Sequence, residues 1–164
     1  IANRGTAYAM AIGRALGLKR KQLADLYFAA MLHDVGKLGL AASEREDESH
    51  PLRGANLVAS SALLGEACDG IRSHHERWDG QGYPIGLRKE EIPLLGRIVA
   101  VADQFDLLSS ERGRALSLRE VEKELERRSG KELDPELVRL FVNVLRQGRS
   151  TQELTRLELQ ELPF

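Results

Sequence analysis

The sequence predicts an all-α protein, and three observations support this fold class. The composition is that of a globular domain rich in helix-forming residues, with 42% hydrophobic, 30% charged and only 5% aromatic residues. Apolar residues recur at intervals of three and four over residues 8–18 and 21–32, as on the buried face of a helix. Two helix starts are also visible, a capping box at residues 117–120 and an aspartate followed by proline at residues 134–135.

With 164 residues, the chain is expected to form one domain, a helical bundle over residues 1–149. The expected helices cover residues 8–18, 21–32, 50–64, 66–75 and 93–108, and two more follow the caps at Ser117 and Asp134. Gly17 is placed to stop the first helix. The glycines of residues 79–84 predict an irregular loop with positive φ angles. Residues 150–164 form a C-terminal tail without a decisive period, and we assign no element to them.

The charge balance and the cysteine content exclude several classes of protein. Lys and Arg number 24 against 25 Asp and Glu, so the basic stripe of a protein that binds polymeric nucleic acid is missing. No apolar stretch approaches the roughly 20 residues of a membrane span. The single cysteine, Cys68, cannot form an internal disulfide and is expected to be a small buried hydrophobe. A cytoplasmic location is therefore expected.

The histidines indicate a shared site, because all four lie within residues 33–75. His33 and Asp34 stand at the end of a predicted helix, where adjacent side chains diverge by about 100°. The two oxygens of Asp34 are then able to bridge two metal ions, as two-metal centres require. A His-Asp pair by itself is more often structural. His74 and His75 add two imidazoles, which are ligands suited to Mn, Fe, Zn or Ni.

Asp103 interrupts the apolar stretch of the helix expected over residues 93–108. Burying an unpaired carboxylate costs several kcal/mol, so a cationic partner is expected nearby. A metal ion and an Arg or Lys counter-ion both satisfy this requirement.

Four blocks of sequence carry a resemblance to a known family. They are residues 33–37 (HDVGK), 50–55 (HPLRGA), 74–84 (HHERWDGQGYP) and 101–106 (VADQFD). On these blocks the chain resembles the HD-GYP domains, a bacterial branch of the HD metal-dependent phosphohydrolases, over most of its length. The resemblance implies an all-helical fold and hydrolysis of the second messenger cyclic di-GMP to the linear dinucleotide or GMP, as part of signal transduction.

The resemblance also implies a centre of two divalent ions, Fe or Mn, with Ni or Zn as alternatives. His33, Asp34 and Asp103 are then ligands of the first ion. The second ion, bridged by Asp34, is held also by His50, His74 and His75. Asp34 takes a catalytic role as the bridging ligand.

Three further residues are implied to meet the substrate, namely Lys37, Tyr83 and Arg112. Lys37 matches the phosphate-facing lysine of the family and is the second catalytic candidate, although a solvated lysine at a helix end is the plain alternative. Tyr83 belongs to the Gly-Tyr-Pro motif, which shapes the site entrance and is associated with docking of cyclase domains of the GGDEF type. Its ring is suited to stack on guanine, or simply to pin the loop.

The chain departs from the family pattern at three places. Ile1 stands where the family has its first metal-binding histidine, and residues 38–49 are about half as long as usual. The second phosphate-binding cation, for which Arg114 is a candidate, is also in doubt. An alternative therefore stays open beside the phosphodiesterase: a degenerate domain that senses a cyclic dinucleotide or docks a partner without turnover. Another HD phosphohydrolase is a third reading, and we expect a regulatory domain in a longer protein.

Overall fold

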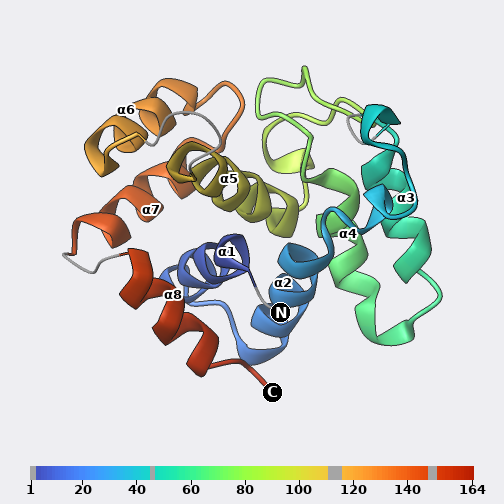
Figure 1. The fold of residues 1–164 in the computed structure, drawn as a ribbon, viewed down its shortest axis with the longest axis horizontal. Coiled ribbons are helices and arrows are strands. Elements are labelled where there is room, and N and C mark those ends of the chain that lie inside the picture. Colours follow the sequence, from blue (N-terminus) through green and yellow to red (C-terminus); the bar gives the residue numbers. More distant parts are fainter. Residues whose placement is uncertain (1–2, 45–46, 111–115, 148–150) are drawn as a thin grey trace.

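The computed structural model describes residues 3–44, 47–110, 116–147 and 151–164, and in these ranges it contains helices and no β-strand (Figure 1). The α-helices are α1 (Arg4–Ala15), α2 (Arg20–Leu32), α3 (His50–Val58), α4 (Gly65–Ser73), α5 (Leu94–Ser109), α6 (Leu118–Arg128), α7 (Pro135–Arg146) and α8 (Thr151–Gln160). The predicted all-α fold class is confirmed. No helix in the described ranges is both long and apolar enough to cross a membrane.

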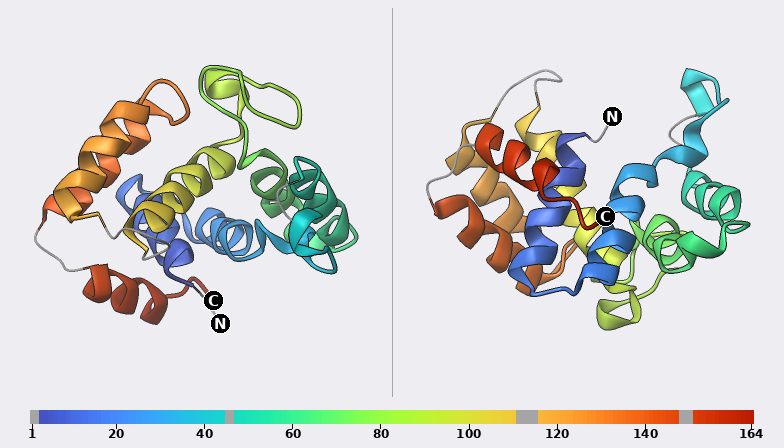
Figure 2. Two further views of the ribbon diagram at one scale, coloured as in Figure 1. Left: turned by 45° about the horizontal axis from the view of Figure 1, so that its top comes forward. Right: turned by 90° about the horizontal axis from the view of Figure 1, so that it is seen from below.

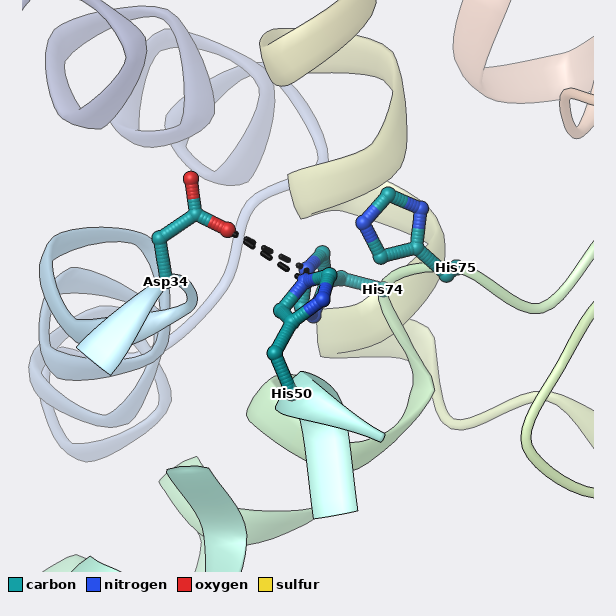
Figure 3. A group of neighbouring side chains, drawn as sticks. All are labelled: Asp34, His50, His74 and His75. Carbon is teal, nitrogen blue, oxygen red and sulfur yellow. Dashed lines mark hydrogen bonds and ion pairs between the residues drawn. The ribbon is translucent and has the colours of Figure 1, made fainter. Parts of the chain in front are cut away.

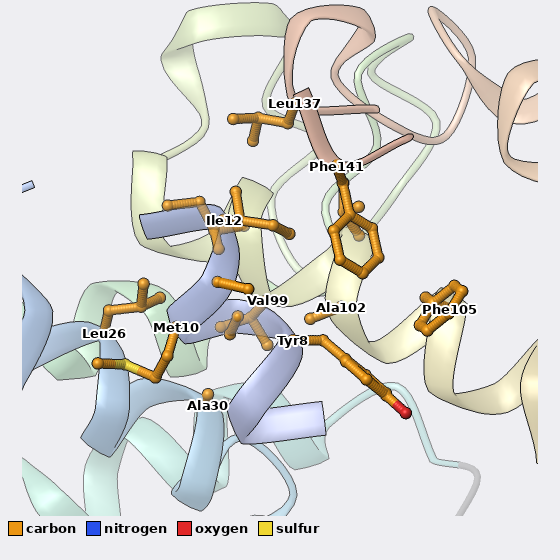
Figure 4. Close-up of a cluster of buried hydrophobic side chains, with 14 of the residues drawn as sticks. Tyr8, Met10, Ile12, Leu26, Ala30, Val99, Ala102, Phe105, Leu137 and Phe141 are labelled. Carbon is orange, nitrogen blue, oxygen red and sulfur yellow. The ribbon is translucent and has the colours of Figure 1, made fainter. Parts of the chain in front are cut away.

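Helices α1 and α5 form the centre of the bundle. Figures 1 and 2 show α6, α7 and α8 on one side of these two helices, with α3 and α4 on the other side. In the core, the ring of Tyr8 from α1 packs edge-on against Phe105 from α5, with the ring centroids 4.7 Å apart (Figure 4). Phe105 packs in the same way against Phe141 from α7, with a centroid distance of 4.9 Å. Each buried side chain of this size contributes about 1.5–3 kcal/mol to stability.

The two caps predicted from the sequence are present. The Ser117 hydroxyl accepts a hydrogen bond from the backbone N–H of Glu120, and the Glu120 carboxylate accepts one from the N–H of Ser117. At the start of α7, one oxygen of Asp134 accepts the N–H of Glu136 at 2.9 Å. Helices α6 and α7 therefore begin where these local signals place them.

Other predicted boundaries are shifted. The first helix begins at Arg4 rather than at residue 8, because Asn3 caps it by accepting the N–H of Thr6. The helix expected over residues 50–64 ends at Val58, and a separate 3₁₀ turn follows at Ala62–Leu64. The fourth helix ends at Ser73, two residues before the expected end, which leaves the histidine pair outside it.

The C-terminal tail, for which no element was expected, contains helix α8. Leu154 of α8 is buried in the core, and Glu158 forms an ion pair with Arg14 of α1 at 2.6 Å. The sequence of α8 has no decisive period, and tertiary contact with α1 supplies much of the stability of this helix.

Candidate metal centre

Four side chains from three separate segments converge beside α5. Asp34 follows α2, His50 begins α3, and the pair His74 and His75 follows α4 (Figure 3). Each of the four has a ligand atom within 4.8 Å of those of the other three. Figure 3 shows the Asp34 carboxylate on one side of the group, directed at the rings of His50 and His74.

Two further residues, His33 and Asp103, belong to the same cluster. The Nε2 atom of His33 lies 3.5 Å from Oδ2 of Asp34 and 3.4 Å from Oδ1 of Asp103 on α5. The other oxygen of Asp34, Oδ1, lies 3.4 Å from Nε2 of His50 and 3.8 Å from Nε2 of His74. The structure thus brings together all six residues proposed as ligands from the sequence, and the two oxygens of the Asp34 carboxylate lie near different rings of the cluster.

The local backbone at Asp34 differs from the expectation. Helix α2 ends at Leu32, so Asp34 lies in a turn with φ −98° and ψ 10° rather than in a helix, and a 3₁₀ turn, η1 (Val35–Lys37), follows. Gly36 lets this turn touch α3, because a Cβ at this position would lie 2.0 Å from the carbonyl oxygen of His50. This close approach brings Asp34 to the histidine at the start of α3.

Three of the imidazoles are oriented by backbone carbonyl groups. The Nδ1 atoms of His33, His50 and His74 lie 2.7, 2.9 and 2.6 Å from the carbonyl oxygens of the residues three positions earlier. A carbonyl oxygen only accepts hydrogen bonds, so Nδ1 carries the proton in each ring. In the neutral rings the Nε2 lone pairs are therefore directed into the cluster, as metal ligation needs.

The donor set fits a divalent metal ion. The Nε2 atoms of His50 and His74 lie 3.3 Å apart, and both side chains are almost fully buried. Two lone pairs facing each other at this distance repel unless a cation lies between or beside them. Imidazole nitrogens mixed with carboxylate oxygens suit Mn, Fe, Zn or Ni.

The protonation states also favour metal binding. Burial, followed by the charge of His75, holds the pKa of His74 well below its usual value. Burial and then His50 lower the pKa of His75 to about 4. Burial of His33 acts in the same direction, but the hydrogen bond and charge of Asp103 outweigh it and raise the pKa of His33. The histidine pair is therefore neutral near pH 7, ready to donate lone pairs.

The predicted substrate-contacting residues have different outcomes. The Nζ atom of Lys37 lies 3.0 Å from Oδ1 of Asp34, at the edge of the cluster. A cavity of about 290 Å³ opens beside the cluster, and its lining includes His75, Asp103 and Tyr83. One face of the Tyr83 ring is stacked on His75, so this face is not available to a base. Arg112, together with Ile1 and Arg114, lies outside the described residues.

Reasoning from the sequence missed Glu76. Its carboxylate is only 4% exposed and accepts three backbone N–H groups from the segment after Tyr83 and Pro84. The one sequence signal is that this glutamate directly follows the histidine pair.

Comparison with known proteins places this arrangement in a family. The family model of the HD domain matches residues 2–137 of this chain. The chain, an all-α domain with a His/Asp cluster, therefore belongs to the HD domain family, whose members are metal-dependent. The recognition of an HD-GYP type of domain is confirmed by its relatives.

A cyclic di-GMP phosphodiesterase of Thermotoga maritima is 37% identical over 149 residues, which cover 81% of this chain and 40% of that protein. A cyclic di-GMP phosphodiesterase of Vibrio cholerae is 38% identical over 140 residues, covering 73% of this chain and 28% of that protein. The crystal structure of a cyclic GMP-AMP-specific phosphodiesterase of V. cholerae superposes with a TM-score of 0.80 at 26% identity, covering 98% of this chain and 48% of that chain. The chain therefore spans less than half the length of each of these three proteins.

Proposed function

We propose that the chain is a metal-dependent phosphodiesterase domain that hydrolyses a cyclic dinucleotide, with cyclic di-GMP as the first candidate. The observation that carries this proposal is the position of Asp34, whose two carboxylate oxygens face two different groups of ligands. The names of the relatives support the substrate class, and both cyclic di-GMP and cyclic GMP-AMP occur among them.

The ligands divide between two ions as the resemblance implies. His33, Asp103 and Oδ2 of Asp34 would hold one ion. The second ion would be held by Oδ1 of Asp34 and by His50, His74 and His75. Fe or Mn is proposed, with Ni or Zn as alternatives. Bound there, two divalent ions lower the pKa of a water molecule and neutralise charge on phosphate oxygens.

The remaining residues of the site bind and orient the substrate. Lys37 lies beside Asp34 and adds a positive charge for a phosphate oxygen, and Tyr83 forms one wall of the cavity, where its free face suits a purine base. Arg112 is kept as a proposed phosphate contact. Hydrolysis adds one water molecule: a new P–O bond forms to the water oxygen, one ester P–O bond breaks, and a ribose hydroxyl is released.

Two finer points also stay proposals. The exposed Ile85, which follows the Gly-Tyr-Pro motif, belongs to a loop that suits docking of a GGDEF-type cyclase domain. A bacterial cytoplasmic location accords with the buried free thiol of Cys68.

The proposal is tested on protein purified without oxygen and reloaded with Mn²⁺ or Fe²⁺. Metal content is measured first, and cyclic di-GMP and cyclic GMP-AMP are then offered separately, with the products separated by chromatography. We expect two ions per chain and the linear dinucleotide or GMP as product. The variant Asp103→Asn is expected to hold less metal and to lose hydrolysis. If the protein holds two ions and binds the dinucleotide but does not cleave it, the proposed enzymatic function is wrong, and the alternative of a domain that senses a cyclic dinucleotide is favoured.

A further inference from the structure

His75 differs from the other histidines of the cluster in what orients its ring. His33, His50 and His74 each place Nδ1 against a backbone carbonyl oxygen of the preceding turn. Within the described part of the chain, no carbonyl group does this for His75. His75 also follows the end of α4, so no helix hydrogen bond fixes its backbone. Another part of the molecule must orient this ring.

The ring of His75 rests on the ring of Tyr83. The two planes are inclined by only 15°, and their centroids lie 4.9 Å apart. The backbone N–H of Tyr83 also donates a hydrogen bond to the carbonyl oxygen of His75, at 3.2 Å. Both the side chain and the backbone of His75 are therefore held by the same loop residue.

Gly82 allows the loop to approach this closely. A Cβ on Gly82 would lie 2.4 Å from both the carbonyl oxygen of His75 and the backbone nitrogen of Arg77. These neighbours are backbone atoms that have no freedom to turn away. The loop therefore lies directly against the chain segment that carries the metal-binding pair.

Glu76 fastens the other end of this loop. Oε1 of Glu76 accepts the N–H of Ile85 at 2.8 Å, and Oε2 accepts the N–H groups of Gly86 and Leu87 at 2.9 and 3.0 Å. Charge-assisted hydrogen bonds of this kind are about twice as strong as neutral ones. A buried carboxylate adjacent to His75 thus closes residues 82–87 over the histidine pair.

We propose that Glu76 is a positioning residue, which holds the Gly-Tyr-Pro loop so that Tyr83 orients His75 for metal binding. This inference rests on the proposed function, because it takes His75 to be a metal ligand. Tyr83, held by Glu76, then fixes the plane of the His75 ring, whereas a backbone carbonyl orients each of the other three rings.

The test is a titration of the metal-free protein with Co²⁺, in which the visible absorption of the bound ion is monitored. This absorption reports both the affinity and the ligand geometry, and it needs no substrate. In Glu76→Gln the amide has one oxygen, so at least one of the three loop N–H groups must face an NH₂ group instead. We expect the Co²⁺ site that contains His75 to lose about ten- to hundredfold in affinity, as when a group that orients a metal ligand is removed. The absorption of the remaining site should stay unchanged.

Two controls separate positioning from general damage. Glu91→Gln makes the same change at an exposed carboxylate that accepts a single loop N–H, from Arg88, and should leave both Co²⁺ affinities unchanged. Tyr83→Phe keeps the stacked ring and should retain the Co²⁺ affinity of the parent, whereas Tyr83→Ala should lose it by as much as Glu76→Gln. Circular dichroism confirms that each variant is folded.

The outcomes of this titration are distinct. Parental Co²⁺ affinity in both Glu76→Gln and Tyr83→Ala would overturn the positioning role and leave the proposed function standing. Loss of affinity in Tyr83→Phe would overturn it as well, since the hydroxyl rather than the stacked ring would then matter. A parent protein that binds no Co²⁺ at all would overturn the proposed function and this inference with it.

Discussion

The Nε2 atoms of His50 and His74 face each other at 3.3 Å, although 24 residues separate the two histidines along the chain. Each ring uses its Nδ1 proton for a backbone carbonyl, so neither has a proton to place between the two nitrogens. A proton added to either ring would lie next to other histidines in a buried site. His74 therefore resists protonation, and a divalent cation relieves the repulsion of the lone pairs.

The metal-free protein should lose stability as the pH falls from about 6.5 towards 4. The pKa values of His74 and His75 are depressed in the folded state, to about 4 for His75, against about 6.5 in an unfolded chain. In this window the unfolded state takes up protons that the folded state refuses, so the free energy of unfolding falls with the pH. The raised pKa of His33 stabilises the folded state fully below about pH 6.5. This contribution to the free energy of unfolding is lost only as the pH rises above that value.

Thermal unfolding monitored by circular dichroism between pH 4 and 8, in the presence of a chelator, measures this dependence. The matched variant His75→Gln should have a shallower slope between pH 6.5 and 4, because one depressed titration is gone. A slope identical to that of the parent would show that the titration of His75 does not contribute to the effect.

Replacing Asp34 by Asn should abolish tight binding of one ion and weaken binding of the other. The amide removes the negative charge and leaves one oxygen, so it is unable to serve both ligand groups. We expect the rate of hydrolysis to fall by more than about a hundredfold. This exceeds the usual loss when a residue that only hydrogen-bonds to a metal ligand is replaced. Helix content should stay the same, because Asp34 lies in the turn between α2 and η1. Elemental analysis and circular dichroism check both points, with Asp69→Asn, at a half-exposed side chain on α4, as the control.

Replacing Gly36 by Ala should destabilise the protein and disturb the cluster together. The added Cβ would meet the His50 carbonyl oxygen at 2.0 Å and the backbone nitrogen of Gly54 at 2.7 Å, so η1 must move away from α3. Overpacking of this kind costs about 1–3 kcal/mol. The control is Gly65→Ala in α4, where no atom lies within 4 Å and the change should be neutral or slightly stabilising. Equal melting temperatures for the two variants would contradict the contact.

Replacing Leu154 by Ala should lower stability without changing metal affinity. Leu154 is buried against the core from α8, and removing its side chain should cost about 2–5 kcal/mol. The exposed Gln152→Ala in the same helix should change stability by less than about 0.5 kcal/mol. Chemical denaturation measures both. A Leu154→Ala variant as stable as the parent would mean that α8 contributes little to the fold.

Short-range chemistry made much of this protein readable from its sequence. The caps at Ser117 and Asp134 place α6 and α7 because a cap acts within a few residues of the helix start. Boundaries without such a signal were less predictable: α3 ends at Val58, although apolar residues resume after Ser60 and Ser61 and continue to Leu64. Helix α8 was not foreseen, because its stability depends on contact with α1.

By itself, the sequence determined the all-α class, since helix-forming patterns are local properties of the chain, and its resemblance to a known family implied the six candidate ligands. Only the tertiary structure showed which oxygen of Asp34 faces which rings, Oδ2 near His33 and Oδ1 near His50 and His74, because that depends on distances between segments that are remote along the chain. Likewise, Glu76 became recognisable only once its carboxylate was seen to accept three N–H groups of the following loop. A hydrogen bond requires a distance near 3 Å and a direction, and residue order alone specifies neither.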